Sequence, residues 1–143
     1  MKKIILLLTL SLFSITGIFA QAWTVKVSWD ASNCVCQGTA NSYFKVSLTI
    51  IDVANEDDFV YNNSVNVDIT KSEHVFTVTS VQTHCNDTSL INIPNYTIYA
   101  GVALYCDETN PPTVVCSDKI TDSGKSCLDF SNGQIPESLE LNK

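Results

Sequence analysis

Apolar and polar residues alternate along much of the chain, which is the pattern of half-buried β-strands. In residues 23–30, WTVKVSWD, an apolar side chain occupies every second position. Residues 43–50, YFKVSLTI, repeat this pattern with Phe44, Val46, Leu48 and Ile50 on one face. The alternation at 65–69 and the Val- and Thr-rich segment 74–82 predict two further strands.

Residues 96–106, YTIYAGVALYC, are apolar at both sets of alternating positions, so we expect a strand at the centre of a sheet. Shorter strands are predicted at 59–61, 113–120 and 127–130. Turn-forming stretches such as NEDD, NDTS, DETNPP and TDSGKS separate them. Beyond the N-terminal segment no stretch has a convincing 3.6-residue period, so no long helix is predicted. The polar segment 131–143 is expected to be disordered or to form a short helical turn.

About seven short strands separated by turns predict an all-β fold, a single antiparallel β-sandwich stapled by disulfides. Three segments resemble fibronectin type III and other Ig-like modules: VSWDAS at 27–32, YFKVSL at 43–48 and YTIYAGVAL at 96–104. The resemblance implies an Ig-like or fibronectin-III-like sandwich. It implies no particular function, because one fold supports many.

The chain begins with two lysines, a run of apolar residues and then small residues around Ala20, which together predict a signal peptide over 1–20. We expect the sandwich domain to span 21–130 and a polar C-terminal tail to occupy 131–143. No later segment is apolar over the roughly 20 residues that a membrane span needs. The predicted location is secreted, extracellular or periplasmic.

Charge narrows the range of partners. Without residues 1–20 the chain has six lysines, no arginine and fifteen acids, a formal charge of −9. Nucleic-acid binding and adhesion to anionic lipid both depend on basic residues, so neither is expected.

Six cysteines follow the predicted signal peptide: Cys34, Cys36, Cys85, Cys106, Cys116 and Cys127. An even number in an exported chain predicts disulfides. A bond between Cys34 and Cys36 is disfavoured, because side chains two apart on an extended backbone point the same way. The Asn110-Pro111-Pro112 turn favours a bond between Cys106 and Cys116. Cys34 and Cys36 would then pair with Cys85 and Cys127, in an order that the spacing leaves open.

Two kinds of metal site are conceivable. Cys34, Cys36, His84 and Cys85 are zinc-ligand types, but their spacing differs from that of structural zinc sites, and disulfides are favoured. Calcium binds carboxylate and carbonyl oxygens, and the candidate ligands are Asp30, Asp57, Asp58, Asp107 and Glu108. No D-x-D-x-D-G loop is present. No cofactor other than this calcium ion is expected.

Motifs of catalysis are missing. The G-K-S of residues 124–126 lacks the glycine that a phosphate loop needs at the position of Lys119, so we expect a turn at 121–126. His74 and His84 are expected at the surface, and neither G-x-S-x-G nor H-E-x-x-H occurs. A Ser-His-Asp triad is defined by geometry, which one sequence leaves open. The prediction is a protein that is not an enzyme.

Tyr99 and Tyr105 flank Gly101 and Ala103 on the second face of the predicted central strand. If exposed, this face would be a flat apolar platform suited to a sugar or a partner protein. The commoner outcome is that a loop or the second sheet covers such a face.

Sequons begin at Asn62, Asn86 and Asn95, and they would mark exposed, glycosylated positions only in a eukaryotic secretory pathway.

The leading functional prediction is a secreted, disulfide-stabilised binding or adhesion module whose partner is an extracellular protein or glycan. One alternative is a binding protein that depends on calcium or carbohydrate. Another is a small secreted hydrolase, or a protease inhibitor that acts through the Pro111-Pro112 loop.

Overall fold

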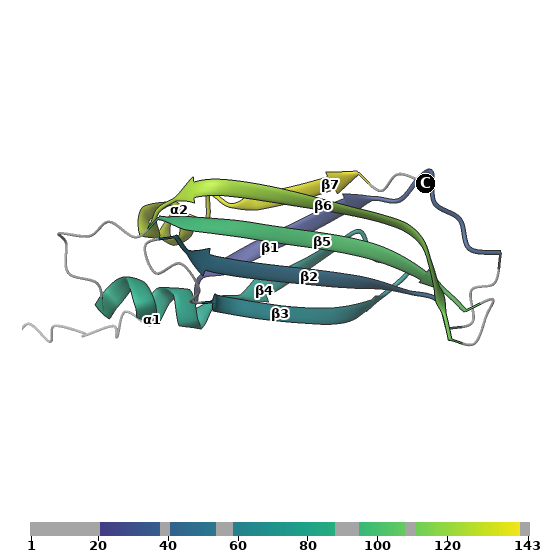
Figure 1. The fold of residues 1–143 in the computed structure, drawn as a ribbon, viewed down its shortest axis with the longest axis horizontal. Coiled ribbons are helices and arrows are strands. Elements are labelled where there is room, and N and C mark those ends of the chain that lie inside the picture. Colours follow the sequence, from purple (N-terminus) through teal and green to yellow (C-terminus); the bar gives the residue numbers. More distant parts are fainter. Residues whose placement is uncertain (1–20, 38–40, 54–58, 88–94, 108–110, 141–143) are drawn as a thin grey trace, which may run out of the picture.

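The computed structural model describes residues 21–37, 41–53, 59–87, 95–107 and 111–140. Most of these residues form strands, arranged in two layers (Figure 1). The elements in chain order are β1 (Thr24–Asp30), β2 (Tyr43–Asp52), β3 (Phe59–Asp68), β4 (Glu73–Thr77), α1 (Thr79–Asp87), β5 (Tyr96–Cys106), β6 (Thr113–Lys125), α2 (Cys127–Ser131) and β7 (Pro136–Glu140). The predicted signal peptide, residues 1–20, lies outside the described residues.

The larger sheet has four antiparallel strands in the order β3-β2-β5-β6. Strand β5 lies between β2 and β6, so the prediction of a central strand at 96–106 is confirmed. Its register pairs Gly101 with Ser47 of β2 and with Lys119 of β6. The separate strands expected at 59–61 and 65–69 are parts of one strand, β3.

The smaller sheet has the order β4-β1-β7. Strand β1 pairs antiparallel with β4 and parallel with β7, so the expectation of a purely antiparallel arrangement is wrong at this edge. The segment 131–143, expected to be a polar tail, thus contains a strand. Ile135, just before β7, is 3 % exposed and belongs to the core.

One hydrophobic core lies between the layers. The inward positions of β1 are Val25, Val27 and Trp29, and those of β2 are Phe44, Val46, Leu48 and Ile50, as the alternation predicted. Aromatic contacts join the two sheets: Trp29 meets Phe44 at 5.2 Å between ring centroids, and Tyr61 meets Phe76 at 6.2 Å.

Three sequence predictions of local structure are wrong. Segment 74–82 is strand only to Thr77 and then becomes helix α1, whose buried side chain Val81 packs into the core. Residues 127–130 form helix α2 rather than a strand, and Ser126 caps its N-terminus. Residues 121–125 continue strand β6 instead of forming a turn; Gly124 supplies a positive φ of 76° there.

The disulfides are Cys34–Cys116, Cys36–Cys106 and Cys85–Cys127. The expectation that Cys34 and Cys36 bond to different partners is confirmed, whereas the favoured Cys106–Cys116 bond is wrong. In the β5–β6 register Cys116 lies opposite Leu104, and Cys106 lies opposite Thr113. Cys106 and Cys116 are therefore not directly opposite each other. Both are buried, and each forms a disulfide with one cysteine of the segment after β1.

The staples lie at both ends of the molecule. Helices α1 and α2, which Cys85–Cys127 joins, lie at one end of the sheets, and the segment after β1 lies at the other (Figure 1). The disulfides thus fix both ends of the two-layered framework that contains the four-stranded sheet.

Candidate functional site

The outward face of the four-stranded sheet contains the strongest candidate site. Because side chains alternate along a strand, the positions opposite the core residues of β2, β5 and β6 share this face. We call it the tyrosine face and define it by Tyr43, Lys45, Ser47, Tyr99, Gly101, Ala103, Tyr105, Ser117 and Lys119. The three-stranded sheet packs against the opposite face, so it does not cover these residues.

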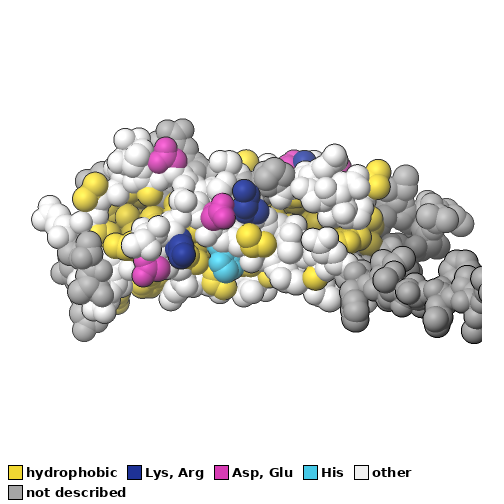
Figure 2. Space-filling model, turned by 180° about the vertical axis from the view of Figure 1, so that it is seen from behind, with side chains coloured by type: hydrophobic (Ala, Val, Ile, Leu, Met, Phe, Trp, Pro, Cys, Tyr) yellow, Lys and Arg dark blue, Asp and Glu magenta, His cyan; other side chains and the backbone are white. Residues whose placement is uncertain are grey.

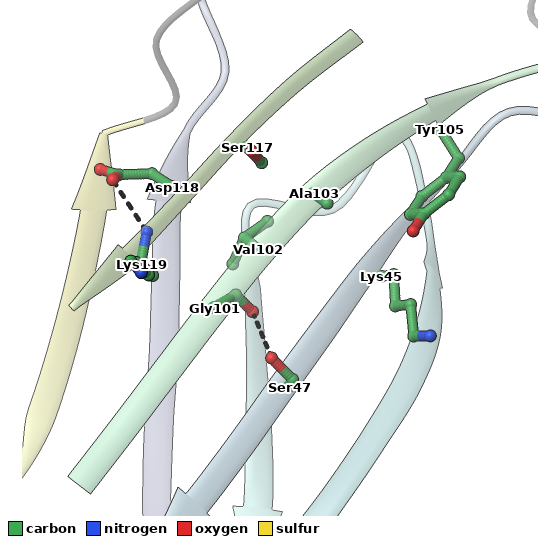
Figure 3. Close-up of a pocket in the computed structure, with 9 residues that line it drawn as sticks. All are labelled: Lys45, Ser47, Gly101, Val102, Ala103, Tyr105, Ser117, Asp118 and Lys119. Atoms are coloured by element: carbon green, nitrogen blue, oxygen red, sulfur yellow. Dashed lines mark hydrogen bonds between the residues drawn. The ribbon is translucent and has the colours of Figure 1, made fainter. Parts of the chain in front are cut away.

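A shallow hollow of about 610 Å³ lies in the middle of the tyrosine face. Figure 3 shows Gly101 and Ala103 of β5 at its centre, with Lys45 and Ser47 of β2 on one side and Ser117 of β6 on the other. The hollow exists because the two central residues have almost no side chain. Its lining residues are Lys45, Ser47, Gly101, Val102, Ala103, Tyr105, Ser117, Asp118 and Lys119.

Gly101 leaves room for the Ser47 side chain of β2, which would have to turn away from a Cβ atom at position 101. A Cβ atom at this position would lie 2.9 Å from Ser47 Oγ, closer than such atoms normally come. The Ser47 hydroxyl instead donates a hydrogen bond to the Gly101 carbonyl at 3.3 Å (Figure 3). The floor of the hollow is therefore a serine hydroxyl held against bare backbone.

Tyrosines lie on the tyrosine face on both sides of Gly101, and one of them, Tyr105, lines the hollow. Tyr105 stacks on Tyr43 of the neighbouring strand, with ring centroids 5.1 Å apart and planes 6° from parallel. Tyr99 is 42 % exposed on the other side of Gly101. Stacking limits the rotamers of Tyr43 and Tyr105, so this end of the hollow is an ordered aromatic wall.

The sequence placed Tyr99 and Tyr105 on one face with Gly101 and Ala103 between them, and the structure has this arrangement. The sequence analysis did not predict that Tyr43, Lys45 or Lys119 belongs to the site. The alternation of YFKVSL does put Tyr43 and Lys45 on the outward side of their strand. Only the pairing of β2 and β6 with β5 shows that they lie beside Gly101.

The calcium candidates are not brought together in the described part of the chain. Asp57, Asp58 and Glu108 lie outside it. The Asp30 carboxylate accepts a hydrogen bond from the Ser32 N–H at 2.9 Å, and Asp107 accepts one from Asn41 at 2.6 Å. Among the described residues no group of three or more His, Cys, Asp or Glu side chains could hold a metal ion.

A histidine–aspartate contact that the sequence did not indicate lies near α1. His84 was expected in a surface loop, but it lies on α1, and its Nε2 is 3.0 Å from Oδ2 of Asp52, which is only 3 % exposed. The Tyr96 hydroxyl is 3.3 Å from Cys85 Sγ, and burial, helped by the charge of Asp52, raises the Tyr96 pKa well above its ordinary value. These contacts join α1 to the four-stranded sheet, and we assign them a structural role.

The sequon asparagines all lie at exposed positions. Asn62 is on β3, Asn86 is on α1 and Asn95 immediately precedes β5. Asn62 also accepts a hydrogen bond from Thr49 at 3.2 Å, two residues along β2 from Ser47. A glycan at Asn62 would therefore stand close to the tyrosine face.

Comparison with known proteins finds no matching family model, no matching curated protein and no matching solved structure. Three disulfides indicate an oxidising compartment of the extracellular type. Neither of the helices in the described ranges has the length and apolar character to cross a membrane.

Proposed function

We propose that this protein is an exported binding or adhesion module, without catalytic activity, that uses the tyrosine face to hold an extracellular partner. The observation that carries the proposal is the uncovered hollow at Gly101 with ordered tyrosines beside it. A water-exposed sheet face normally carries long polar side chains. Small residues between aromatic ones leave the backbone and the apolar ring surfaces accessible to a partner.

The scaffold supports this role through its rigidity. The residues of the tyrosine face come from three hydrogen-bonded neighbouring strands. Cys34–Cys116 and Cys36–Cys106 fasten one end of the sheet, and Cys85–Cys127 joins the two helices at the other end. Recognition by such a surface loses little conformational entropy, because the contact residues are already in place.

The strand order fits the proposed Ig-like or fibronectin-III-like sandwich. In Ig-like domains one sheet contains strands C, F and G, and the other contains B and E. Strands β2, β5 and β6 correspond to the first set, and β1 and β4 to the second. The usual first strand would be replaced by β7, which lies beside β1.

The opposite face of the molecule supplies a contrast. Figure 2 shows the outward side of the three-stranded sheet, where basic side chains lie beside acidic ones. One such pair is Lys26 and Glu73, whose charged atoms are 3.7 Å apart. This face has the mixed charge of an ordinary solvated surface, which favours the tyrosine face as the contact surface.

The test is to fill the hollow without changing charge. Ala103→Gln places a long neutral side chain beside Gly101, and Thr24→Gln makes a similar change at an exposed position of β1. The immobilised mature protein and both variants are incubated with extracellular material from the source cells, and bound glycan and protein are quantified. Melting temperatures confirm that all three are folded.

We expect Ala103→Gln to lose most of the captured partner and Thr24→Gln to retain it. Equal capture by the two variants would rule out the tyrosine face as the contact surface.

A further inference from the structure

The two lysines of the tyrosine face, Lys45 and Lys119, differ from Lys26 and Lys125 in having no carboxylate partner among the described residues. Lys26 Nζ lies 3.7 Å from the Glu73 carboxylate, and Lys125 Nζ lies 2.5 Å from that of Asp122. Within the described ranges no ion pair involves Lys45 or Lys119. Both line the hollow, from strands on either side of β5.

Acidic side chains near this face are already hydrogen-bonded to their own neighbours. Asp118 accepts the backbone N–H of Lys119 at 2.8 Å, and Figure 3 shows its carboxylate on the far side of β6 from Gly101. Asp68, opposite Tyr43 in the register, accepts both the N–H and the hydroxyl of Thr70, at 2.8 and 2.7 Å. These hydrogen bonds leave both carboxylates negatively charged, but the Asp118 carboxylate points away from Gly101 (Figure 3), whereas Lys45 and Lys119 both line the hollow, on a chain whose net charge is negative.

The uncharged groups of the hollow suit sugar rings. Tyrosine rings offer apolar surface to the C–H side of a pyranose, while their hydroxyls stay polar. Ser47 and Ser117 add hydroxyls at the floor and the far side. Tyr99 and Tyr105 are six residues apart on one strand, roughly 20 Å, so the face is long enough for a chain of sugars rather than a single ring.

We infer that the ligand of the tyrosine face is an acidic polysaccharide whose rings bear carboxylates, an inference that rests on the proposed function. The tyrosines hold the rings, and Lys45 and Lys119 each attract a carboxylate. Two lysines match a chain that bears a carboxylate on every ring or on every second ring. Duplex nucleic acid and densely sulfated chains present more charge over the same length, which the acidic molecule as a whole repels.

Binding is measured by calorimetry with oligosaccharides of alginate, polygalacturonate and hyaluronan. The same oligosaccharides with their carboxylates chemically reduced to alcohols are the matched neutral probes, and oligothymidylate is the nucleic-acid probe. The proteins are the mature chain, Lys45→Gln, Lys119→Gln and Lys26→Gln. Lys26→Gln makes the same charge change on the three-stranded sheet, where Lys26 is paired with Glu73.

We expect at least one uronate probe to bind and its reduced form to bind at least tenfold more weakly. Lys45→Gln and Lys119→Gln should each weaken binding about three- to tenfold, with Lys26→Gln close to wild type. Added salt should weaken binding, because these charges are exposed.

Three results would overturn the inference: no binding to any uronate probe, equal binding of reduced probes, or tighter binding of oligothymidylate. If capture of a partner still depends on Ala103 in the earlier experiment, the proposed function survives such a failure. An equal loss in Lys26→Gln would assign the effect to overall charge and would also overturn the site.

Discussion

At the residue scale, a short capping sequence decides a local structure against the hydrophobic pattern. Residues 127–130, CLDF, are mostly apolar and were predicted to be a short strand, yet Ser126 begins a helix by accepting the Asp129 N–H on its side chain. Asp129 in turn accepts the N–H and the hydroxyl of Ser126, both at 2.7 Å. This reciprocal arrangement is the capping box, with Asp in place of the usual Glu. Four residues are too few for periodicity to outweigh it.

Acid titration tests the capping box. The hydrogen bonds from the Ser126 backbone and side chain lower the Asp129 pKa. A carboxyl whose pKa is lower in the folded than in the unfolded state stabilises the fold above the unfolded value, about 3.9, and loses that contribution as the pH falls through the folded value. We expect Asp129→Asn to melt lower than wild type at neutral pH, and the difference to shrink as the pH falls below about 4. A difference in melting temperature that is constant across this range would contradict the assignment.

At the element scale, strands were predicted best where alternation is long, and failures lie where a segment is short or changes period. Strand β5 matches its prediction at both ends, because both its faces are apolar over 11 residues. The prediction for segment 74–82 fails because apolar residues continue beyond the end of β4: Val78 lies between the strand and the helix, and Val81 lies in α1. β7 was missed because its residues, PESLE, are mostly polar, and its pairing with β1 is visible only in the structure.

Ile135 tests whether the C-terminal segment belongs to the fold. Its side chain is 3 % exposed in the core. Ile135→Ala should lower the free energy of unfolding by about 2–5 kcal/mol, measured by urea denaturation. Leu128→Ala, at a residue 66 % exposed, is the matched aliphatic control and should change it by no more than about 0.5 kcal/mol. Equal effects would mean that 131–143 behaves as a tail.

At the scale of the whole molecule, cystines link segments that are distant in sequence. Cys34–Cys116 and Cys36–Cys106 close loops of 82 and 70 residues and hold one end of the molecule. Cys85–Cys127 closes 42 residues and joins the two helices at the other end. The C-x-C pair thus ties the connection after β1 to both β5 and β6.

Removing matched cysteines tests this connectivity. Cys36→Ser combined with Cys106→Ser should leave no free thiol when titrated in denaturant, whereas any other partner for either residue would leave two. The single variant Cys36→Ser should expose one thiol, which peptide labelling should identify as Cys106. Losing this bond should lower the free energy of unfolding by about 2–4 kcal/mol. Two thiols in the double variant would contradict the Cys36–Cys106 bond.

Sequence by itself determined the β-rich class, the inward residues of β1, β2 and β5, the use of cysteines as staples, and the shared face of Tyr99 and Tyr105. These properties follow from composition and from alternation within one strand. Only the tertiary structure decided the cystine partners, the parallel edge strand β7 and the placement of Tyr43, Lys45 and Lys119 beside Gly101. The physical reason is that each depends on which strand lies next to which and in what register, and register arises from the packing of the whole core.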